Sequence, residues 1–238
     1  MSTLQLLNNV EHKNLKVNTK HSAEFGDNVG GSLVFPEEFL MAHREYPLLL
    51  QKDPETEDFQ FIALFGFQKD ENLFLSEAGW KGQYIPALMR REPFLIGFQA
   101  TQGGPEGRTP VIHIDMDSPR VSQDGERLFL ANGGNTPYLN TLKKTLMQIH
   151  EGIATSRTFL AVLQENDLIE QLALDVEFND GSQLKTNSYY TINQEKLLML
   201  SGAKVAEFHR NGVLQLCYMM LASTGNIKNL IDMHNRLI

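Results

Sequence analysis

Cysteine is almost absent from the chain, whose 238 residues include only Cys217. A single cysteine cannot form an internal disulfide, and it cannot supply the thiolates of a cysteine-based zinc site. Cys217 lies in the apolar run VLQLCYMMLA. Because free cysteine usually packs as a small hydrophobic side chain, we expect a buried, unreactive thiol.

Long hydrophobic runs are also missing. No window of about 20 residues is uniformly apolar, so no transmembrane helix is expected. The first residues, MSTLQLLNNVEHK, lack the basic start and the longer apolar stretch of a signal peptide. These features predict a soluble, cytoplasmic protein.

Positive charge is scarce: 21 lysines and arginines stand against 29 acidic residues, for a formal net charge of −8. The sequence also has no long stretch rich in lysine and arginine. An acidic surface repels phosphate backbones and anionic lipids, so we predict no nucleic-acid partner and no membrane insertion.

The short motifs of phosphate binding and hydrolysis are absent. The loop TQGGPEGRT contains glycines but lacks the lysine of a phosphate-binding G-x-x-x-x-G-K-[ST] loop. No G-x-G-x-x-G, G-x-S-x-G or H-E-x-x-H occurs, and no spacing indicates a catalytic triad. We therefore predict no cofactor and assign no catalytic residue.

Short strands joined by turns dominate the first part of the chain. Residues 1–35 are expected to be mostly loop with short extended pieces, and Pro36 is expected to begin a short helix that Pro47 stops. Strands are expected in the segments PLLLQ, FQFIALFGF, NLFLSE, FLIGFQA and PVIHIDM. Without long intervening helices, these strands favour antiparallel sheets.

Helical periodicity enters after a soft boundary near residues 132–137. It predicts a long helix from Pro137 to about Glu165, which Gly152 is expected to bend or break. LALDVEF followed by Asn-Asp-Gly predicts a hairpin, and Asn193 is expected to cap the next helix.

Two elements near the C-terminus are less defined by pattern. VLQLCYMMLA is compatible with a helix or a buried strand, since periodicity does not decide a short apolar run. Ser223 or Asn226 is expected to cap a last helix. Together these elements predict one α+β unit over residues 1–238, in which an antiparallel β-rich N-terminal lobe packs with a mixed helical and hairpin C-terminal lobe.

The segment VIHIDMD is the strongest candidate for enzyme chemistry. On a strand, His113, Asp115 and Asp117 would share one face. His-x-Asp is also part of a non-haem iron triad, which needs a distal histidine such as His150 or His209. The favoured alternative is a half-exposed strand with polar residues on its wet side, so no metal site is favoured.

The stretch YIPALMRREPF, at 84–94, carries Arg90 and Arg91 between two prolines. Pro86 is expected to begin a short helix and Pro93 to end it. Helical residues are about 100° apart, so at most one of the two arginines easily faces inward. An inward arginine needs an acidic partner, for which Glu71 and Glu77 are candidates.

An outward arginine in this stretch could instead contact an anion, because guanidinium groups bind carboxylates and phosphates in a bidentate manner. Neighbouring aromatic rings could add a stacking surface. The predicted ligand-binding set is therefore Trp80, Tyr84, Arg90, Arg91, Glu71 and Asn72. The favoured alternative is that the arginines pair with acidic side chains inside the protein and stabilise the fold.

Several of these segments together resemble the bacterial SapC family. The matching stretches are PEEFLMAHREYPLLL, ALFGFQKDENLFL, GWKGQYIPALMRREPF, DMDSPRV, DGERLF and YTINQEKLLML. The resemblance covers roughly residues 20–236. It implies a family named after a surface-layer gene cluster, with some members described as peptide-transport components and with TonB-dependent receptors and halogenase-like proteins among the gene neighbours.

The resemblance implies an accessory role in an uptake or modification system and supplies no catalytic residues. The first hypothesis is therefore a non-catalytic binding protein for a protein partner or a small anionic ligand. The alternatives are a metal-dependent enzyme using the His-x-Asp strand and a surface-layer-associated structural protein. The sequence leaves a homo-oligomer open.

Overall fold

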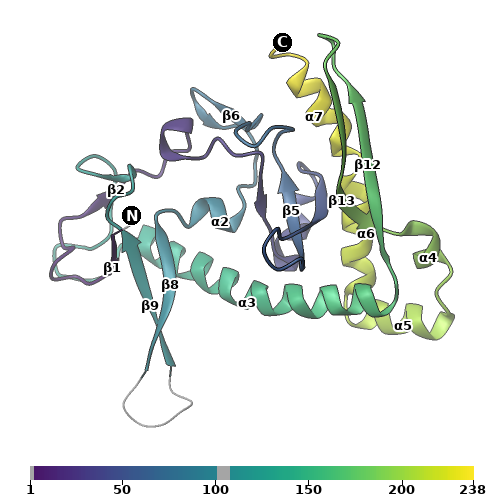
Figure 1. Ribbon diagram of the computed structural model, residues 1–238. Coiled ribbons are helices and arrows are strands. Elements are labelled where there is room, and N and C mark those ends of the chain that lie inside the picture. The colour runs from purple at the N-terminus through teal and green to yellow at the C-terminus, as the bar shows by residue number, and fades with distance from the viewer. Residues whose placement is uncertain (1–2, 101–107) are drawn as a thin grey trace. The chain divides into compact units, whose positions relative to one another are not determined.

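A computed structural model describes residues 3–100 and 108–238, and its chain forms two compact units (Figure 1). The first unit comprises Met1–Asp27 and Ala87–Glu151, and the second comprises Asn28–Pro86 and Gly152–Ile238. The predicted boundary near residues 132–137 lies inside the first unit. That the whole chain is one domain stays a prediction.

The first unit is built on an antiparallel sheet with the strand order β1-β9-β8. Its strands are β1 (Leu4–Leu6), β9 (Arg108–Asp115) and β8 (Phe94–Ala100). A smaller sheet has the order β10 (Val121–Ser122), β2 (Lys16–Val17) and β11 (Glu126–Arg127). The unit also holds the 3-10 helix η1 (Ala23–Phe25), helix α2 (Ala87–Arg90) and the first part of α3 (Pro137–Glu165).

The core of the first unit lies between these sheets and the start of α3. Its buried side chains are Val17, Phe94, Ile114, Leu128, Phe129, Leu139, Leu142 and Leu146. The last three belong to the apolar stripe that helical spacing predicts for α3. One turn of helix separates each from the next, so they bury one continuous face.

The second unit contains a five-stranded antiparallel sheet with the order β12-β13-β4-β5-β3. The strands are β12 (Ile169–Glu177), β13 (Gln183–Ile192), β4 (Leu48–Lys52), β5 (Phe59–Leu64) and β3 (Gly31–Leu33). The short pair β6 (Leu75–Ser76) and β7 (Gly79–Trp80) forms a separate sheet. Helical elements are η2 (Pro36–Glu38), α1 (Phe39–Ala42), α4 (Gln194–Leu198), α5 (Gly202–Arg210), α6 (Val213–Ser223) and α7 (Asn226–His234).

The α+β class, with antiparallel sheets, is confirmed. In the hairpin β12–β13, Gly181 takes the left-handed conformation, with φ of 82°, that an Asn-Asp-Gly turn needs. The Asn193 side chain accepts a hydrogen bond from the Lys196 amide and caps α4, as predicted. VLQLCYMMLA is a helix: α6 packs on β13 and β4, and Cys217 is fully buried in it.

Two local predictions are wrong because side-chain amides take other partners. NLFLSE is not a strand throughout: the Asn72 side chain accepts the Phe74 amide and forms a tight turn, so only Leu75–Ser76 is extended. Asn226 does not cap α7, because its side-chain amide donates to the carbonyls of His43 and Tyr46.

Ser223 does not cap α7 either; it ends α6 and ties that helix to β4. Its fully buried hydroxyl accepts the Leu48 amide at 2.8 Å and donates to the Met220 carbonyl at 2.6 Å. Within the described residues, no helix combines the length and the apolar character needed to cross a membrane.

Gly152 does not break α3, which runs without interruption from Pro137 to Glu165. The glycine instead allows a close approach, since a Cβ at this position would lie 2.5 Å from Cγ and 2.6 Å from Cβ of Phe35. Packing, rather than chain flexibility, accounts for the glycine.

We predict that Gly152→Ala destabilises the protein by about 1–3 kcal/mol, although alanine favours a helix, because the added methyl group overpacks against Phe35. Gly202→Ala is the matched control: it stands at the first residue of α5, where a new Cβ meets nothing within 4 Å. Urea unfolding measures both changes. Equal or greater stability of the Gly152 variant would contradict this packing role.

Candidate functional site

The Trp80–Tyr84 segment is fixed to the chain around Tyr46 by hydrogen bonds. The fully buried Tyr46 hydroxyl accepts the Trp80 indole N–H at 2.9 Å and donates to the Tyr84 carbonyl. Burial raises the pKa of the Tyr46 phenol well above its ordinary value, against the opposing effect of the Trp80 hydrogen bond. The phenol therefore stays protonated and keeps its donor.

Two carboxylates complete this attachment. Glu38, which is 1% exposed, accepts the Tyr84 hydroxyl at 2.7 Å and the Phe35 amide at 3.0 Å. Glu45 accepts the backbone amides of Gln83 at 2.8 Å and Tyr84 at 3.1 Å. Trp80 and Tyr84, predicted as ligand contacts, therefore hold two parts of the second unit together.

Gly82 leaves no space between these groups. A Cβ there would lie 2.5 Å from Glu45 Oε2 and 2.6 Å from the Tyr46 hydroxyl. The segments PEEFLMAHREYP and GWKGQYIP, which both carry the family resemblance, are thus fitted to each other in the fold.

Glu71 and Asn72 also lie in the second unit and serve its internal contacts. Glu71 Oε1 lies 2.7 Å from His234 Nδ1, and its Oε2 accepts the Phe67 amide at 2.6 Å. Asn72 is 7% exposed and, as noted above, shapes a turn. Glu77, the other acidic candidate, is exposed.

Arg90 and Arg91 lie in the first unit, at and just after the end of α2. Both are half-buried. Arg91 pairs with Glu92 at 3.3 Å and donates to the Phe94 carbonyl at 3.3 Å, so its partner is neither Glu71 nor Glu77. The predicted set is therefore divided between the two units, and anion binding by either arginine stays a prediction.

The candidate metal ligands do not share one strand face, because β9 ends at Asp115 and Asp117 lies in the following turn. Asp115 accepts the Asp117 amide at 3.1 Å, and Asp117 accepts the Thr3 hydroxyl at 2.7 Å. The His113 ring lies over Gly97, where a Cβ would meet it at 2.7 Å. In residues 3–100 and 108–238, no group of three or more His, Cys, Asp or Glu residues could hold a metal ion.

Cys217 is equally unsuited to nucleophilic chemistry. Burial raises the pKa of its thiol to about 12, so the reactive thiolate does not form near neutral pH. The prediction of a buried thiol is confirmed.

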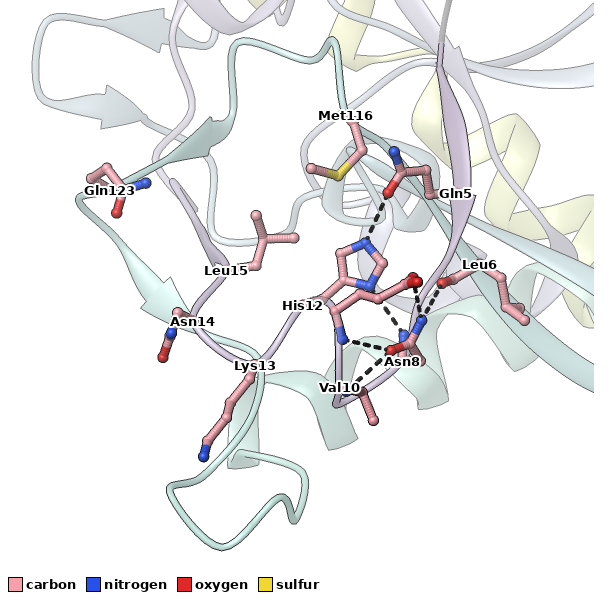
Figure 2. Close-up of a pocket in the computed structure, with 11 residues that line it drawn as sticks. Gln5, Leu6, Asn8, Val10, His12, Lys13, Asn14, Leu15, Met116 and Gln123 are labelled. Atoms are coloured by element: carbon pink, nitrogen blue, oxygen red, sulfur yellow. Dashed lines mark hydrogen bonds between the residues drawn. The ribbon is translucent and has the colours of Figure 1, made fainter.

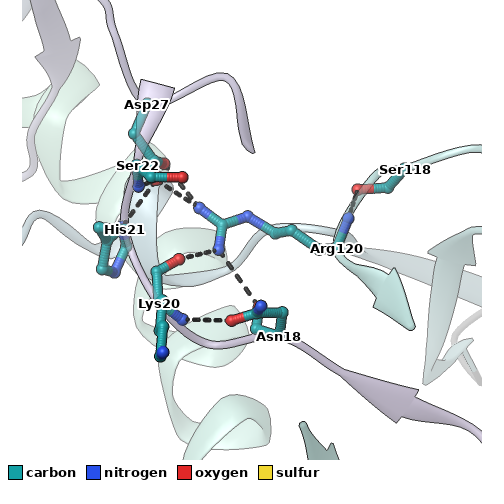
Figure 3. A network of polar contacts seen from close by, with 7 residues as sticks. All are labelled: Asn18, Lys20, His21, Ser22, Asp27, Ser118 and Arg120. Carbon is teal, nitrogen blue, oxygen red and sulfur yellow. Dashed lines mark hydrogen bonds and ion pairs between the residues drawn. The ribbon is translucent and has the colours of Figure 1, made fainter. Parts of the chain in front are cut away.

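A buried arginine does pair with a carboxylate, but at a position that the sequence did not indicate. Arg120 and Asp27 are 2% and 1% exposed, and Arg120 Nη2 lies 2.7 Å from both Asp27 oxygens. Nη1 donates to the carbonyls of Lys20 at 2.7 Å and Asn18 at 3.3 Å (Figure 3). The guanidinium also lies over the Phe25 ring, 5.1 Å from its centroid.

Asp27 is ionised in this network. Burial favours the neutral acid, but hydrogen bonding from His21 and the charge of Arg120 outweigh it and lower the Asp27 pKa below its ordinary range. The Ser22 amide also donates to Asp27, at 2.9 Å. One ion pair thus organises the loop from Asn18 to Asp27.

An open pocket of about 800 Å³ lies in the first unit, beside β1 and the chain that follows it (Figure 2). Its polar lining includes Gln5, Asn14 and Gln123, and its apolar lining includes Leu15 and Met116. No sequence pattern indicates this pocket, because its residues come from loops and short strands that share no periodicity.

His12 also lines this pocket and is 3% exposed. Its Nδ1 accepts the Asn8 amide at 3.2 Å, so Nε2 carries the proton and donates to Gln5 Oε1 at 3.1 Å. This bond orients the Gln5 carboxamide, whose NH₂ group is turned away from the ring (Figure 2). Both ring nitrogens are engaged, which suits positioning rather than proton transfer.

We predict that Tyr46→Phe lowers the free energy of unfolding by about 1–3 kcal/mol, because the Trp80 N–H and the Tyr84 carbonyl lose their partner. Trp80 is the single tryptophan, so its fluorescence during urea unfolding reports this site directly. Tyr218→Phe, at a side chain 48% exposed, is the control. Identical unfolding midpoints for the two variants would refute the proposed bracing.

We further predict that Asp27→Asn costs about 3 kcal/mol at pH 7, because Arg120 is left buried without a counter-charge. Since the folded-state pKa of Asp27 is depressed, its stabilisation is complete above about pH 4 and is lost as the pH falls through that lower pKa. The difference in the free energy of unfolding between wild type and the Asp27→Asn variant should therefore become smaller as the pH is lowered. Asp124→Asn, at an exposed carboxylate in the same unit, should show neither effect in urea titrations.

The comparisons with known proteins place the chain in a family. No curated protein and no solved structure matches it. A sequence model of the SapC family matches residues 7–230, which is nearly all of the 238-residue chain. The chain therefore belongs to the SapC family.

Proposed function

We propose that the chain is a non-catalytic binding protein that serves as an accessory component of an uptake or modification system. The observation that supports this is the pocket in Figure 2, where side-chain amides are the commonest polar groups: Gln5, Asn8, Asn14 and Gln123 line it beside Glu11, His12 and Lys13. Side-chain amides both donate and accept hydrogen bonds without a formal charge. Such a lining suits recognition rather than bond cleavage.

A short extended segment of a protein partner fits this pocket best. Peptide bonds present the same alternation of donors and acceptors as Gln5, Asn14 and Gln123. Leu15 and Met116 provide an apolar surface for one partner side chain, and methionine adapts readily to different shapes. Because His12 holds Gln5 in one orientation, part of the surface is ordered before binding.

Arg90 and Arg91 remain a second proposed contact, for an anionic group. Arg91 already has Glu92 and the Phe94 carbonyl as partners. A ligand carboxylate or phosphate would therefore have to compete with an existing ion pair. This competition makes the amide-lined pocket the first surface to test.

The test measures binding of individually purified proteins encoded beside this chain. We predict that replacing both Asn14 and Gln123 by alanine weakens binding about tenfold, since two hydrogen bonds of about 0.5–1.5 kcal/mol each are lost. Biolayer interferometry on the immobilised full chain gives the dissociation constants.

The matched control replaces Gln183 and Asn187, which are exposed on β13, by alanine. This variant removes the same chemical groups from a different surface and should bind as wild type does. Unchanged affinity in the Asn14/Gln123 variant, or equal losses in both variants, would refute the pocket as the recognition site.

A further inference from the structure

Strand β8 has an open edge. It is the outer strand of the sheet β1-β9-β8, so only one of its sides is paired. The Asp115 amide donates to the Pro93 carbonyl, and residues 94–100 then pair in register with 114–108. Antiparallel hydrogen bonding alternates, so the odd-numbered residues of β8 bond to β9 and the even-numbered ones face outward.

The outward backbone groups belong to Ile96 and Phe98. Within the described residues, the N–H and C=O groups of these two residues make no hydrogen bond on the open side. Phe94, the preceding outward residue, is already engaged: its amide donates to the Arg91 carbonyl, and its own carbonyl accepts from the Arg91 side chain. The open edge thus begins at Ile96.

This edge lacks the usual protection against pairing. Natural sheets shield such strands with charged residues, prolines or bulges. The sequence of β8, FLIGFQA, contains no charged residue and no proline. Its pairing with β9 shows no register shift, so it has no bulge. Phe98 packs against His150 of α3 with ring centroids 4.6 Å apart, yet its side chain remains 40% exposed.

We propose that β8 pairs antiparallel with β8 of a second copy of the chain, about a two-fold axis at Gly97. In this register Ile96 lies opposite Phe98 of the other copy, and Phe98 lies opposite Ile96. Both residues carry their backbone groups outward, so the two copies exchange four N–H···O=C hydrogen bonds. The two sheets become one six-stranded sheet.

The side chains fit the same register. Phe94, Ile96 and Phe98 alternate onto the face that packs on the core of the first unit. Each copy therefore brings Ile96 beside the exposed ring of Phe98, a pairing of aromatic and β-branched side chains that stabilises sheets. Gly97 lies opposite Gly97 of the other copy, so no side chain stands at the axis.

A second copy fits this edge better than a partner of another composition because the edge is complementary to itself. The paired segment carries no charge, so two copies do not repel each other there. A two-fold axis also matches each unpaired donor with an acceptor in a single closed contact.

The first test uses sedimentation velocity of the full chain over a range of concentrations. Wild type is expected to form a dimer that dissociates on dilution. Phe98→Lys should raise the dimer dissociation constant at least about tenfold, because it removes two symmetric side-chain pairs and places a charge at the edge. Met199→Lys, at a side chain 80% exposed on the second unit, should leave dimerisation unchanged.

The second test does not depend on the folding of that variant. In the proposed register, residue 95 lies opposite residue 99 of the other copy, with Cβ atoms about 4.5–5.5 Å apart. A mixture of Leu95→Cys and Gln99→Cys chains should therefore form a disulfide-linked dimer on mild oxidation. Gln99→Cys alone should not, because two copies of that residue lie several residues apart along the strands.

A chain that is monomeric throughout, or a Phe98→Lys dimer as tight as wild type, would overturn the proposal. So would cross-linking of Gln99→Cys alone with none in the mixture. Because the amide-lined pocket lies at β1 and not at β8, the Asn14/Gln123 variant should still dimerise. Failure of the proposed binding function and failure of this pairing are thereby distinguishable.

Discussion

The pairing of Arg120 with Asp27 is the constraint on which much of the first unit depends. Both charges are almost completely removed from water, and neither could remain there alone without a cost of several kcal/mol. The Nη1 nitrogen of Arg120 donates hydrogen bonds to the backbone carbonyls of Asn18 and Lys20 in this loop. A stretch whose only regular element is the short 3-10 helix η1 is thereby held in one conformation. In the chain, β2 directly precedes this loop and β10 directly follows Arg120, and both strands belong to the small sheet β10-β2-β11.

The second unit solves the same physical problem with neutral groups and carboxylates. Tyr46, Glu38 and Glu45 accept hydrogen bonds from an indole, a phenol and two backbone amides of the Trp80–Tyr84 segment. A buried donor or acceptor without a partner costs about 1–3 kcal/mol, so these contacts fix the segment in one position. Family-like residues that look suited to ligand binding in the sequence are therefore accounted for by internal hydrogen bonding.

The elements that could be predicted from the sequence are those with local signals. Helical spacing of Leu139, Leu142 and Leu146 identified α3, and Asn-Asp-Gly identified the β12–β13 turn. The role of Gly152 has no local signal because it depends on Phe35, which is more than 100 residues away in the sequence. The same holds for Asn226, whose carbonyl partners are His43 and Tyr46. Local patterns give a residue's preferences, but distant partners decide how those preferences are used.

The candidate site shows the same limit more strongly. Gln5, His12, Met116 and Gln123 line one pocket, yet no spacing rule links residues more than 100 positions apart. The sequence did indicate a difference between neighbouring arginines, but it placed the important buried pair in the wrong stretch, at Arg90–Arg91 and not at Arg120. Arg120 lies within DMDSPRV, so the family resemblance contained the relevant residue without indicating its role.

The division between buried and open polar groups also bears on function. Charged and strongly polar side chains such as Arg120, Asp27 and Glu38 are enclosed with partners, and their contribution is to stability and shape. The pocket presents the side-chain amides of Asn14 and Gln123 to solvent beside the charged Glu11 and Lys13, and the open groups at the β8 edge belong to the backbone. Amide side chains and backbone groups both donate and accept hydrogen bonds, as the backbone of another chain does. The pocket and the β8 edge are therefore the two surfaces at which we propose that the protein binds other chains, the second being a further copy of itself.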